Sequence, residues 1–198
     1  LEKSLFEKIS DRADPSELLM TVVDENVELA QVRLPKNPFV VVFDRPSNLG
    51  NIGSIIRSAN AFGVDLIITT GHGVDPFDPI AIRASMGGIF FTKVCQAESM
   101  QMIKDWISGM RRKHGKLSVI GTDSGAEISL LDQPPILRPV VLLIGNEARG
   151  LSVSLRTLAD KMIKIPMIGK VDSLNAACAA SILMFEIYKA SMGNVDEF

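Results

Sequence analysis

The chain of 198 residues contains few of the residue types that most often carry redox, metal or charge-driven functions. It has two cysteines, two histidines, one tryptophan and one tyrosine, and its 21 Lys and Arg nearly balance its 23 Asp and Glu. The resulting net charge of -2 excludes a histone-like polycation, so any binding of nucleic acid must come from a local basic patch. The hydrophobic fraction of 46% is typical of a globular chain, and the length suits one sizeable core.

The scarce cysteines and histidines show no pattern of a disulfide or metal site. Cys95 and Cys178 are far apart and flanked by apolar residues, so we interpret them as buried thiols in a reducing, cytoplasmic compartment. His72 and His114 have no Cys or His neighbour at ligand spacing, and no metal site is predicted. No apolar run reaches membrane-spanning length and no signal peptide is visible, so no membrane partner is expected.

The hydrophobic pattern divides the chain near residue 38. Residues 1–38 are charged and end in a connector punctuated by prolines, and we expect one or two helices within residues 15–34. Because the first residue is Leu1, this part is the expected remnant of a longer N-terminal region. From Phe39 onward, apolar strands alternate with helices, which predicts an α/β domain over residues 39–198 with a mainly parallel sheet sandwiched by helices.

The expected elements of this domain follow from apolar runs and the glycine or polar residues that end them. Strands are predicted over residues 39–43, 64–69, 89–94, 117–121, 140–144 and 162–165. Helices are predicted over residues 52–62, 98–113, 152–160 and 173–190, with a further short helix after Pro79. The last helix is apolar around most of its circumference, so we expect a partner subunit to cover part of it.

The glycine-rich turns do not match the usual nucleotide fingerprints. Residues 145–151 begin like a P-loop, but Leu151 stands where the phosphate-binding lysine belongs. Residues 50–53 lack the GxGxxG spacing of a dinucleotide site, and no GxSxG turn supports a hydrolase triad.

Three polar clusters remain, each at the predicted end of a strand, where parallel α/β sheets bind ligands. They read NIGSIIRSANAFG over residues 51–63, LLIGNEARGLS over residues 142–152, and IPM followed by DSLNAACAA over residues 165–180. Taken singly, each has a structural explanation as helix caps, turn glycines or solvated loop residues. Their order and spacing together are much harder to ascribe to accident.

In this order the three clusters closely resemble the motifs of the SpoU (or TrmH) family of RNA 2′-O-ribose methyltransferases, within the SPOUT class. The resemblance covers roughly residues 39–188. It implies an α/β sheet whose C-terminal part forms a deep trefoil knot, and a homodimer. It also implies S-adenosyl-L-methionine as the methyl donor and tRNA or rRNA as the substrate, with a slight preference for rRNA.

The resemblance also assigns roles to individual residues of this chain that match the family's motifs. It implies catalytic roles for Asn51, Arg57, Glu147, Ser173 and Asn175. It implies cofactor contacts from Thr122, Gly145, Ile165, Met167 and Leu174. From the distribution of charge, we expect an RNA-binding patch built from Arg45, Arg57, Arg83 and Arg149.

The role of Arg57 needs a physical argument, because the arginine of the first motif is usually assigned the abstraction of a proton. A guanidinium with a pKa above about 12 is a poor base. We therefore expect Arg57 to clamp a phosphate and stabilise the developing alkoxide, and direct proton abstraction remains the alternative. Glu147, Ser173 and Asn175 are expected to position loops and substrate. Two other functions stay open: a catalytically inactive RNA-binding paralogue, and a SPOUT enzyme that methylates a base.

Overall fold

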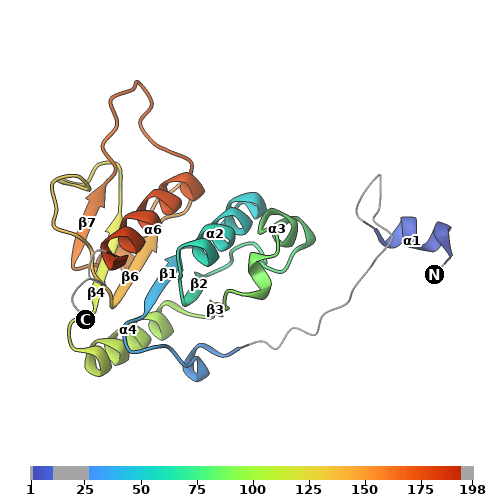
Figure 1. The fold of residues 1–198 in the computed structure, drawn as a ribbon, viewed down its shortest axis with the longest axis horizontal. Coiled ribbons are helices and arrows are strands. Elements are labelled where there is room, and N and C mark those ends of the chain that lie inside the picture. The colour runs from blue at the N-terminus through green and yellow to red at the C-terminus, as the bar shows by residue number, and fades with distance from the viewer. Residues whose placement is uncertain (1, 11–26, 193–198) are drawn as a thin grey trace.

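Runs of apolar residues form the strands of a seven-stranded sheet in a computed structural model that describes residues 2–10 and 27–192 (Figure 1). The strands are β1 Phe39–Phe43, β2 Leu66–Thr70, β3 Val94–Ala97, β4 Ser118–Thr122, β5 Ile128–Ser129, β6 Val140–Ile144 and β7 Lys161–Lys164. They lie in the order β3-β2-β1-β6-β4-β7-β5, and each neighbouring pair is parallel. The predicted α/β class and parallel sheet are confirmed.

Helices cover both faces of this sheet, and successive side chains along β1 point alternately into the two hydrophobic cores on these faces. The helical elements are α1 Lys3–Ile9, η1 Leu29–Gln31, α2 Leu49–Ala61, α3 Pro79–Ala84, η2 Gly88–Phe90, α4 Met100–His114, α5 Val153–Arg156 and α6 Ala176–Met192. Phe39, Val41 and Phe43 of β1 pack with α2, α3 and α6, whereas Val40 and Val42 pack with α4 and α5. Because β1 is fully buried on both faces, its sequence is apolar throughout.

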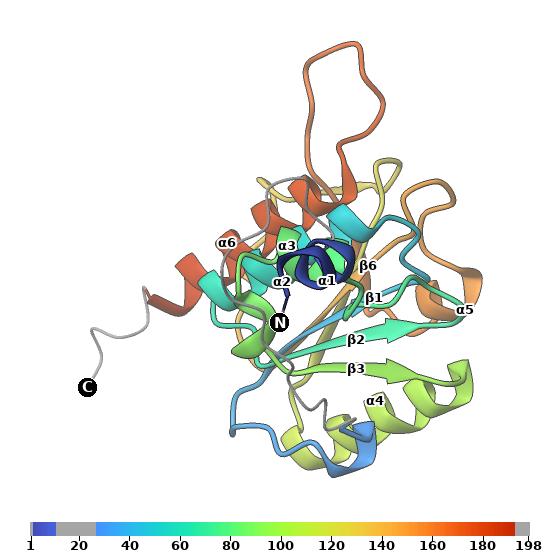
Figure 2. The ribbon, with the colours of Figure 1, turned by 90° about the vertical axis from the view of Figure 1, so that its right-hand side faces the viewer.

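The direction in which the chain adds strands to the sheet reverses between the neighbouring strands β1 and β6. From β1 the chain proceeds outward through β2 and β3, then crosses to β4, β6 and β7 on the other side. Such a switch point, at the carboxyl ends of parallel strands, is where open α/β sheets form ligand sites. The segment between β7 and α6 extends away from the body in both views (Figures 1 and 2). Within the described residues, no helix is long and apolar enough to cross a membrane.

Several boundaries differ from the prediction for identifiable reasons. The strand predicted over residues 89–94 begins only at Val94, because Gly87 adopts a φ of 85° and Gly88–Phe90 forms the 3-10 helix η2. The helix predicted over residues 152–160 ends at Arg156, and the short strand β5 was not predicted. Most of the helical region expected within residues 15–34 lies outside the described residues, and residues 27–34 contain only η1.

One of the two cysteine predictions is wrong. Cys95 on β3 is buried, as expected, but Cys178 in the first turn of α6 is exposed. The apolar neighbours of Cys178 face the core on either side of it along the helix, since Ala177 and Ala180 are buried. Burial on a helix follows the 3.6-residue period rather than the composition of the nearest neighbours.

Close packing of α2 against α3 depends on Gly53, which yields a test of the fold. A Cβ at this position would lie 2.4 Å from the backbone carbonyl oxygen of Ala81. We expect Gly53→Ala to lower the free energy of unfolding by about 1–3 kcal/mol, because two backbones would have to separate.

Gly109→Ala in α4 provides the matched control. The nearest heavy atom to its added Cβ is 3.8 Å away, at the end of the Arg112 side chain. Better helix propensity should raise the free energy of unfolding by up to about 1 kcal/mol. Urea denaturation measures both variants, and equal effects of the two substitutions would contradict the close approach of α2 and α3.

Candidate active site at the carboxyl ends of the strands

A cleft of about 310 Å³ opens at the carboxyl ends of β4, β6 and β7, beside the start of α6. Thr122 ends β4, Gly145 follows β6, Ile165 and Met167 follow β7, and Leu174 precedes α6. These five residues, which sequence analysis predicts as cofactor contacts, all line the cleft. These residues are far apart along the chain but close in space, because the carboxyl ends of neighbouring parallel strands lie at the same edge of the sheet.

The lining of the cleft combines apolar side chains with a few carboxylates. Ile144, Ile163 and Leu183 contribute apolar surface, while Asp123 and Glu147 are its ionisable lining residues. Asp123 forms an ion pair with Arg156 of α5. A cleft with apolar walls and a few polar groups favours a small organic ligand. Among the described residues, no group of three or more His, Cys, Asp or Glu could hold a metal ion.

The loop after β6 forms one wall of the cleft and is closed on itself. The backbones of Asn146 and Gly150 exchange two hydrogen bonds of 3.0 and 2.9 Å. The side-chain Oδ1 of Asn146 also accepts from the amides of Ala148 and Arg149. Gly145 is required because a Cβ there would lie 2.5 Å from the backbone of Gly150, and Gly150 itself adopts a φ of 65°. The loop is therefore held in one shape by its own backbone.

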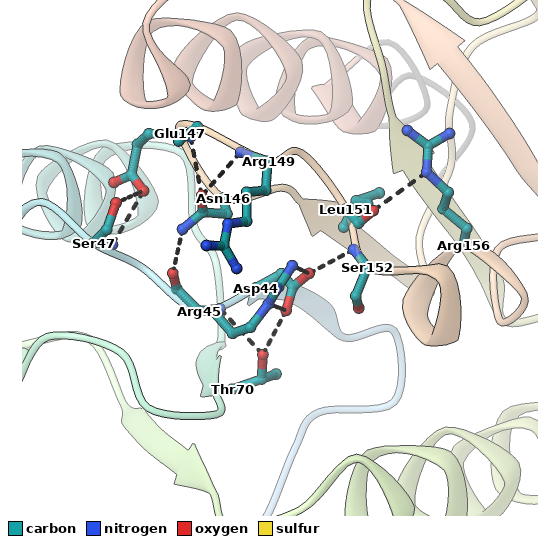
Figure 3. A network of polar contacts seen from close by, with 11 residues as sticks. Asp44, Arg45, Ser47, Thr70, Asn146, Glu147, Arg149, Leu151, Ser152 and Arg156 are labelled. Carbon is teal, nitrogen blue, oxygen red and sulfur yellow. Dashed lines mark hydrogen bonds and ion pairs between the residues drawn. The ribbon is translucent and has the colours of Figure 1, made fainter.

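A chain of side-chain hydrogen bonds joins the three sequence motifs at the edge of the cleft. The Nδ2 of Asn175 donates to the Oδ1 of Asn51 at 2.9 Å, and the Nδ2 of Asn51 donates to the Oε1 of Glu147 at 3.1 Å. The other carboxylate oxygen of Glu147 accepts from the hydroxyl and the amide of Ser47, at 2.7 and 3.1 Å (Figure 3). The three motifs thus form one hydrogen-bonded unit.

The direction of this chain is fixed by the caps of α6. The Oδ1 of Asn175 accepts from the backbone amides of Ala177 and Cys178 in the first turn of α6. Its Nδ2 must therefore face Asn51, whose own Nδ2 must then face Glu147. Glu147 consequently meets only donors, which suits an ionised carboxylate.

Glu147 is stabilised as a carboxylate by these neighbours. Partial burial alone would raise the pKa of Glu147, but hydrogen bonds from Ser47 and Asn51 outweigh it and hold that pKa below its ordinary value. The negative charge at the cleft therefore persists at neutral pH.

The remaining predicted residues lie outside this hydrogen-bonded unit. Ser173 lines the cleft from the projecting loop, whereas Arg57 is exposed on α2 and is not a lining residue. Arg83 and Arg149 are also exposed. The Arg45 guanidinium instead forms a two-bond ion pair with the buried Asp44, at 2.9 Å for each bond. The structure thus presents three of the four arginines of the expected patch to solvent.

Sequence reasoning missed several polar residues that shape the site. Ser47 binds Glu147, Asn48 caps α2 by accepting from the amide of Asn51, and Asn146 closes the loop after β6. The spacing of Asn48 ahead of a helix is a recognisable cap signal. Nothing in the sequence indicates the pairing of Ser47 with Glu147, since 100 residues separate them.

Comparison with known proteins identifies the family. The sequence profile of the SpoU rRNA Methylase family matches residues 38–185, which contain the whole cleft and the hydrogen-bonded chain. The chain belongs to the SpoU rRNA Methylase family.

Relatives in this family include proteins with established names and structures. The chain is 38% identical over 172 residues to the 23S rRNA (uridine(2479)-2′-O)-methyltransferase of Streptomyces viridochromogenes, covering 87% of this chain and 60% of that protein. The SpoU methyltransferase AviRb of the same organism, crystallised with AdoMet, superposes with a TM-score of 0.79 at 37% identity, covering 84% of this chain and 66% of that one. An AdoMet-bound rRNA methyltransferase from Sinorhizobium meliloti superposes with a TM-score of 0.72 at 34% identity, covering 82% of this chain and 60% of that one.

The match to the SpoU family does not extend over the full length of these relatives. The chain spans about half to three-fifths of the length of curated relatives that it matches. The residues that match the family profile, 38–185, contain the sheet and the three motifs.

The charge of Glu147 yields a test that depends on pH. Glu147→Gln places an amide among three donors, so at least one hydrogen bond is lost, and we expect the free energy of unfolding at pH 7 to fall by about 1 kcal/mol. Because the folded-state pKa of Glu147 is depressed, the stability it contributes is present above its unfolded pKa and is lost as pH falls through the folded value.

Urea denaturation of wild type and Glu147→Gln at pH 7 and at several values below pH 4.5 measures this difference. The difference should shrink as the pH falls. A difference that stays constant down to the acid limit of folding would contradict an ionised, hydrogen-bonded Glu147.

Proposed function

We propose that this protein is an S-adenosylmethionine-dependent RNA methyltransferase that modifies a ribose 2′-hydroxyl, with rRNA as the favoured substrate. One observation carries the proposal: residues from three separate motifs converge on a single cleft and its hydrogen-bonded edge. The names of the relatives support both the reaction and the preference for rRNA.

The residues of the cleft fit S-adenosylmethionine. Ile165 and Leu174 provide apolar surface for an adenine ring, and the loop after β6, which lines the cleft, offers backbone hydrogen-bonding groups. The carboxylate of Glu147 gives the cleft a negative charge, which favours a sulfonium cation. We assign Thr122, Gly145, Ile165, Met167 and Leu174 to cofactor binding.

The chain's own residues align the substrate for the reaction. When bound, S-adenosylmethionine supplies an activated methyl group for in-line displacement by the sugar oxygen. We assign Arg57 to clamp a neighbouring RNA phosphate and to stabilise the charge that develops on the 2′-oxygen. Asn51, Glu147, Ser173 and Asn175 hold the loops in the orientation that the displacement requires. Arg83 and Arg149 extend the RNA-binding surface.

A second copy of the chain completes the proposed enzyme. Ile182, Phe185 and Met192 of α6 are 39, 45 and 55% exposed, although they are large and apolar. Their burial in a homodimer would remove this apolar surface from water.

We further propose that the C-terminal part of the chain is knotted, because β7 lies between β4 and β5 in the sheet and α6 then returns to pack against α2. We also propose that residues 39–198 form the catalytic domain and that the protein acts in the cytoplasm.

Transfer of label from methyl-labelled S-adenosylmethionine to RNA tests the proposed reaction directly. After digestion to nucleosides, we expect the label on the ribose of an rRNA nucleotide. Label on a base would instead support the base-methylating alternative. RNA binding without transfer would support the inactive paralogue.

Arg57→Lys tests the role of the guanidinium. The substitution keeps the positive charge but loses the planar fork that binds phosphate through two bonds. We expect methyl transfer to fall by about 100-fold or more, a loss typical of a removed transition-state contact, with unchanged binding of S-adenosylmethionine. Near-normal turnover by this variant would contradict the assignment.

The salt dependence of RNA binding tests the basic patch. Replacing one phosphate-binding arginine should lower the slope of log affinity against log salt by about 0.7 for single-stranded RNA. We expect this change for Arg149→Gln, measured by fluorescence anisotropy. An unchanged slope would contradict a phosphate contact from Arg149.

A further inference from the structure

A second polar network adjoins the cleft loop and is centred on Asp44, which directly follows β1 (Figure 3). Asp44 is fully buried and accepts four hydrogen bonds. The hydroxyl of Thr70 donates at 3.0 Å, the backbone amide of Ser152 at 2.7 Å, and the Arg45 guanidinium at 2.9 Å to each oxygen. The carboxylate therefore joins the ends of β1 and β2 to the start of α5.

The backbone around Asp44 is shaped to fold Arg45 back upon it. Arg45 adopts a φ of 47°, a left-handed conformation that is uncommon for a residue with a side chain. Its amide donates to the hydroxyl of Thr70 at 3.2 Å. At Gly71, which follows β2, a Cβ would lie 2.8 Å from the Cγ of Arg45, so the glycine leaves room for the arginine stem. The ion pair between Arg45 and Asp44 thus depends on the backbone conformation after β1 and on Thr70 and Gly71 at the end of β2.

The same network anchors both ends of the loop that walls the cleft. At its start, the Nδ2 of Asn146 donates to the backbone carbonyl of Arg45 at 2.7 Å. At its end, the amide of Ser152 donates to Asp44. Between these anchors, Glu147, Ala148 and Gly150 line the cleft, as do Gly145 and Asn146 at the start of the loop. Asp44 itself is not a lining residue.

We propose that Asp44 is a positioning residue for the methyl donor: it fixes the loop over residues 145–152 in the shape that binds S-adenosylmethionine. This inference rests on the proposed function. An aspartate is needed because each carboxylate oxygen accepts from two donors, whereas the amide of an asparagine would turn its N–H groups toward two of these four donors. Burial raises the pKa of Asp44, but bonds from Arg45, Ser152 and Thr70 outweigh it, so the group stays ionised.

Asp44→Asn tests the proposal, and Asp65→Asn is its matched control. Asp65 also accepts from the backbone of β1, from the amide of Phe39 at 2.8 Å, and faces an arginine, Arg138, at 3.7 Å. It precedes β2, however, at the opposite edge of the sheet from the cleft. Both variants remove a carboxylate that ties strands together, but only Asp44 touches the cleft loop.

Isothermal titration with S-adenosylmethionine, at a temperature where circular dichroism shows each protein folded, separates the two roles. We expect the Kd to rise about tenfold or more in Asp44→Asn, because a displaced wall loses several contacts at once. The Kd of Asp65→Asn should stay within about twofold of wild type, since its surroundings do not include the cleft. An equal rise in both variants, or none in Asp44→Asn, would overturn the proposal.

Thr70→Val keeps the proposal testable should Asp44→Asn fail to fold. The substitution preserves the shape of the side chain but removes the hydroxyl, which donates to Asp44 and accepts from the amide of Arg45. The Kd should rise about two- to tenfold, a smaller effect than that of Asp44→Asn because Asp44 keeps its bonds from Ser152 and the Arg45 guanidinium. A wild-type Kd in Thr70→Val would count against the network. Wild-type protein that takes up no S-adenosylmethionine would overturn the proposed function itself, whereas tight binding by wild type and Asp44→Asn alike would overturn only the role of Asp44.

Discussion

The hydrogen-bonded chain from Asn175 through Asn51 to Glu147 is the interaction on which the site depends. It connects α6, α2 and the loop after β6, which are separated by 96 and 124 residues along the sequence. Each amide in the chain has one orientation, because Asn175 caps α6 with its oxygen and Glu147 can only accept. A site assembled from the start of α2, the loop after β6 and the start of α6 is therefore held together as one hydrogen-bonded unit.

The sheet makes this chain possible and the surrounding networks keep it in place. Parallel pairing of β1 with β6, of β6 with β4 and of β4 with β7 brings the three motifs to the same edge, where backbone groups at strand ends remain available for ligands. The loop after β6 is closed by its own backbone and fastened at both ends to the residues that follow β1. Apolar burial in the two cores stabilises the sheet, and polar contacts at its edge determine the geometry of the cleft.

Much of this arrangement was predictable from the sequence, and the failures have physical causes. The buried strands 39–43 and 140–144 were predicted with their observed bounds, because short apolar runs rich in β-branched residues and bounded by turn residues are typical of strands covered on both faces. The early strand at residue 89 was wrong because a glycine in the left-handed region starts a 3-10 turn there. That the three motifs meet at one site was predictable from their resemblance to the SpoU family. The partnerships of Ser47 with Glu147 and of Asp44 with Ser152 were not, since pairing over about 100 residues depends on tertiary structure alone.

A double-mutant cycle over Asn51 and Asn175 tests the central claim most directly. The rate of methyl transfer to RNA is measured for wild type, Asn51→Ala, Asn175→Ala and the double variant. If the two amides act as links of one chain, either substitution breaks it, and the double variant should be hardly slower than the slower single variant. Independent losses that multiply in the double variant would contradict the account, because they would show that α2, the loop after β6 and the start of α6 are held separately.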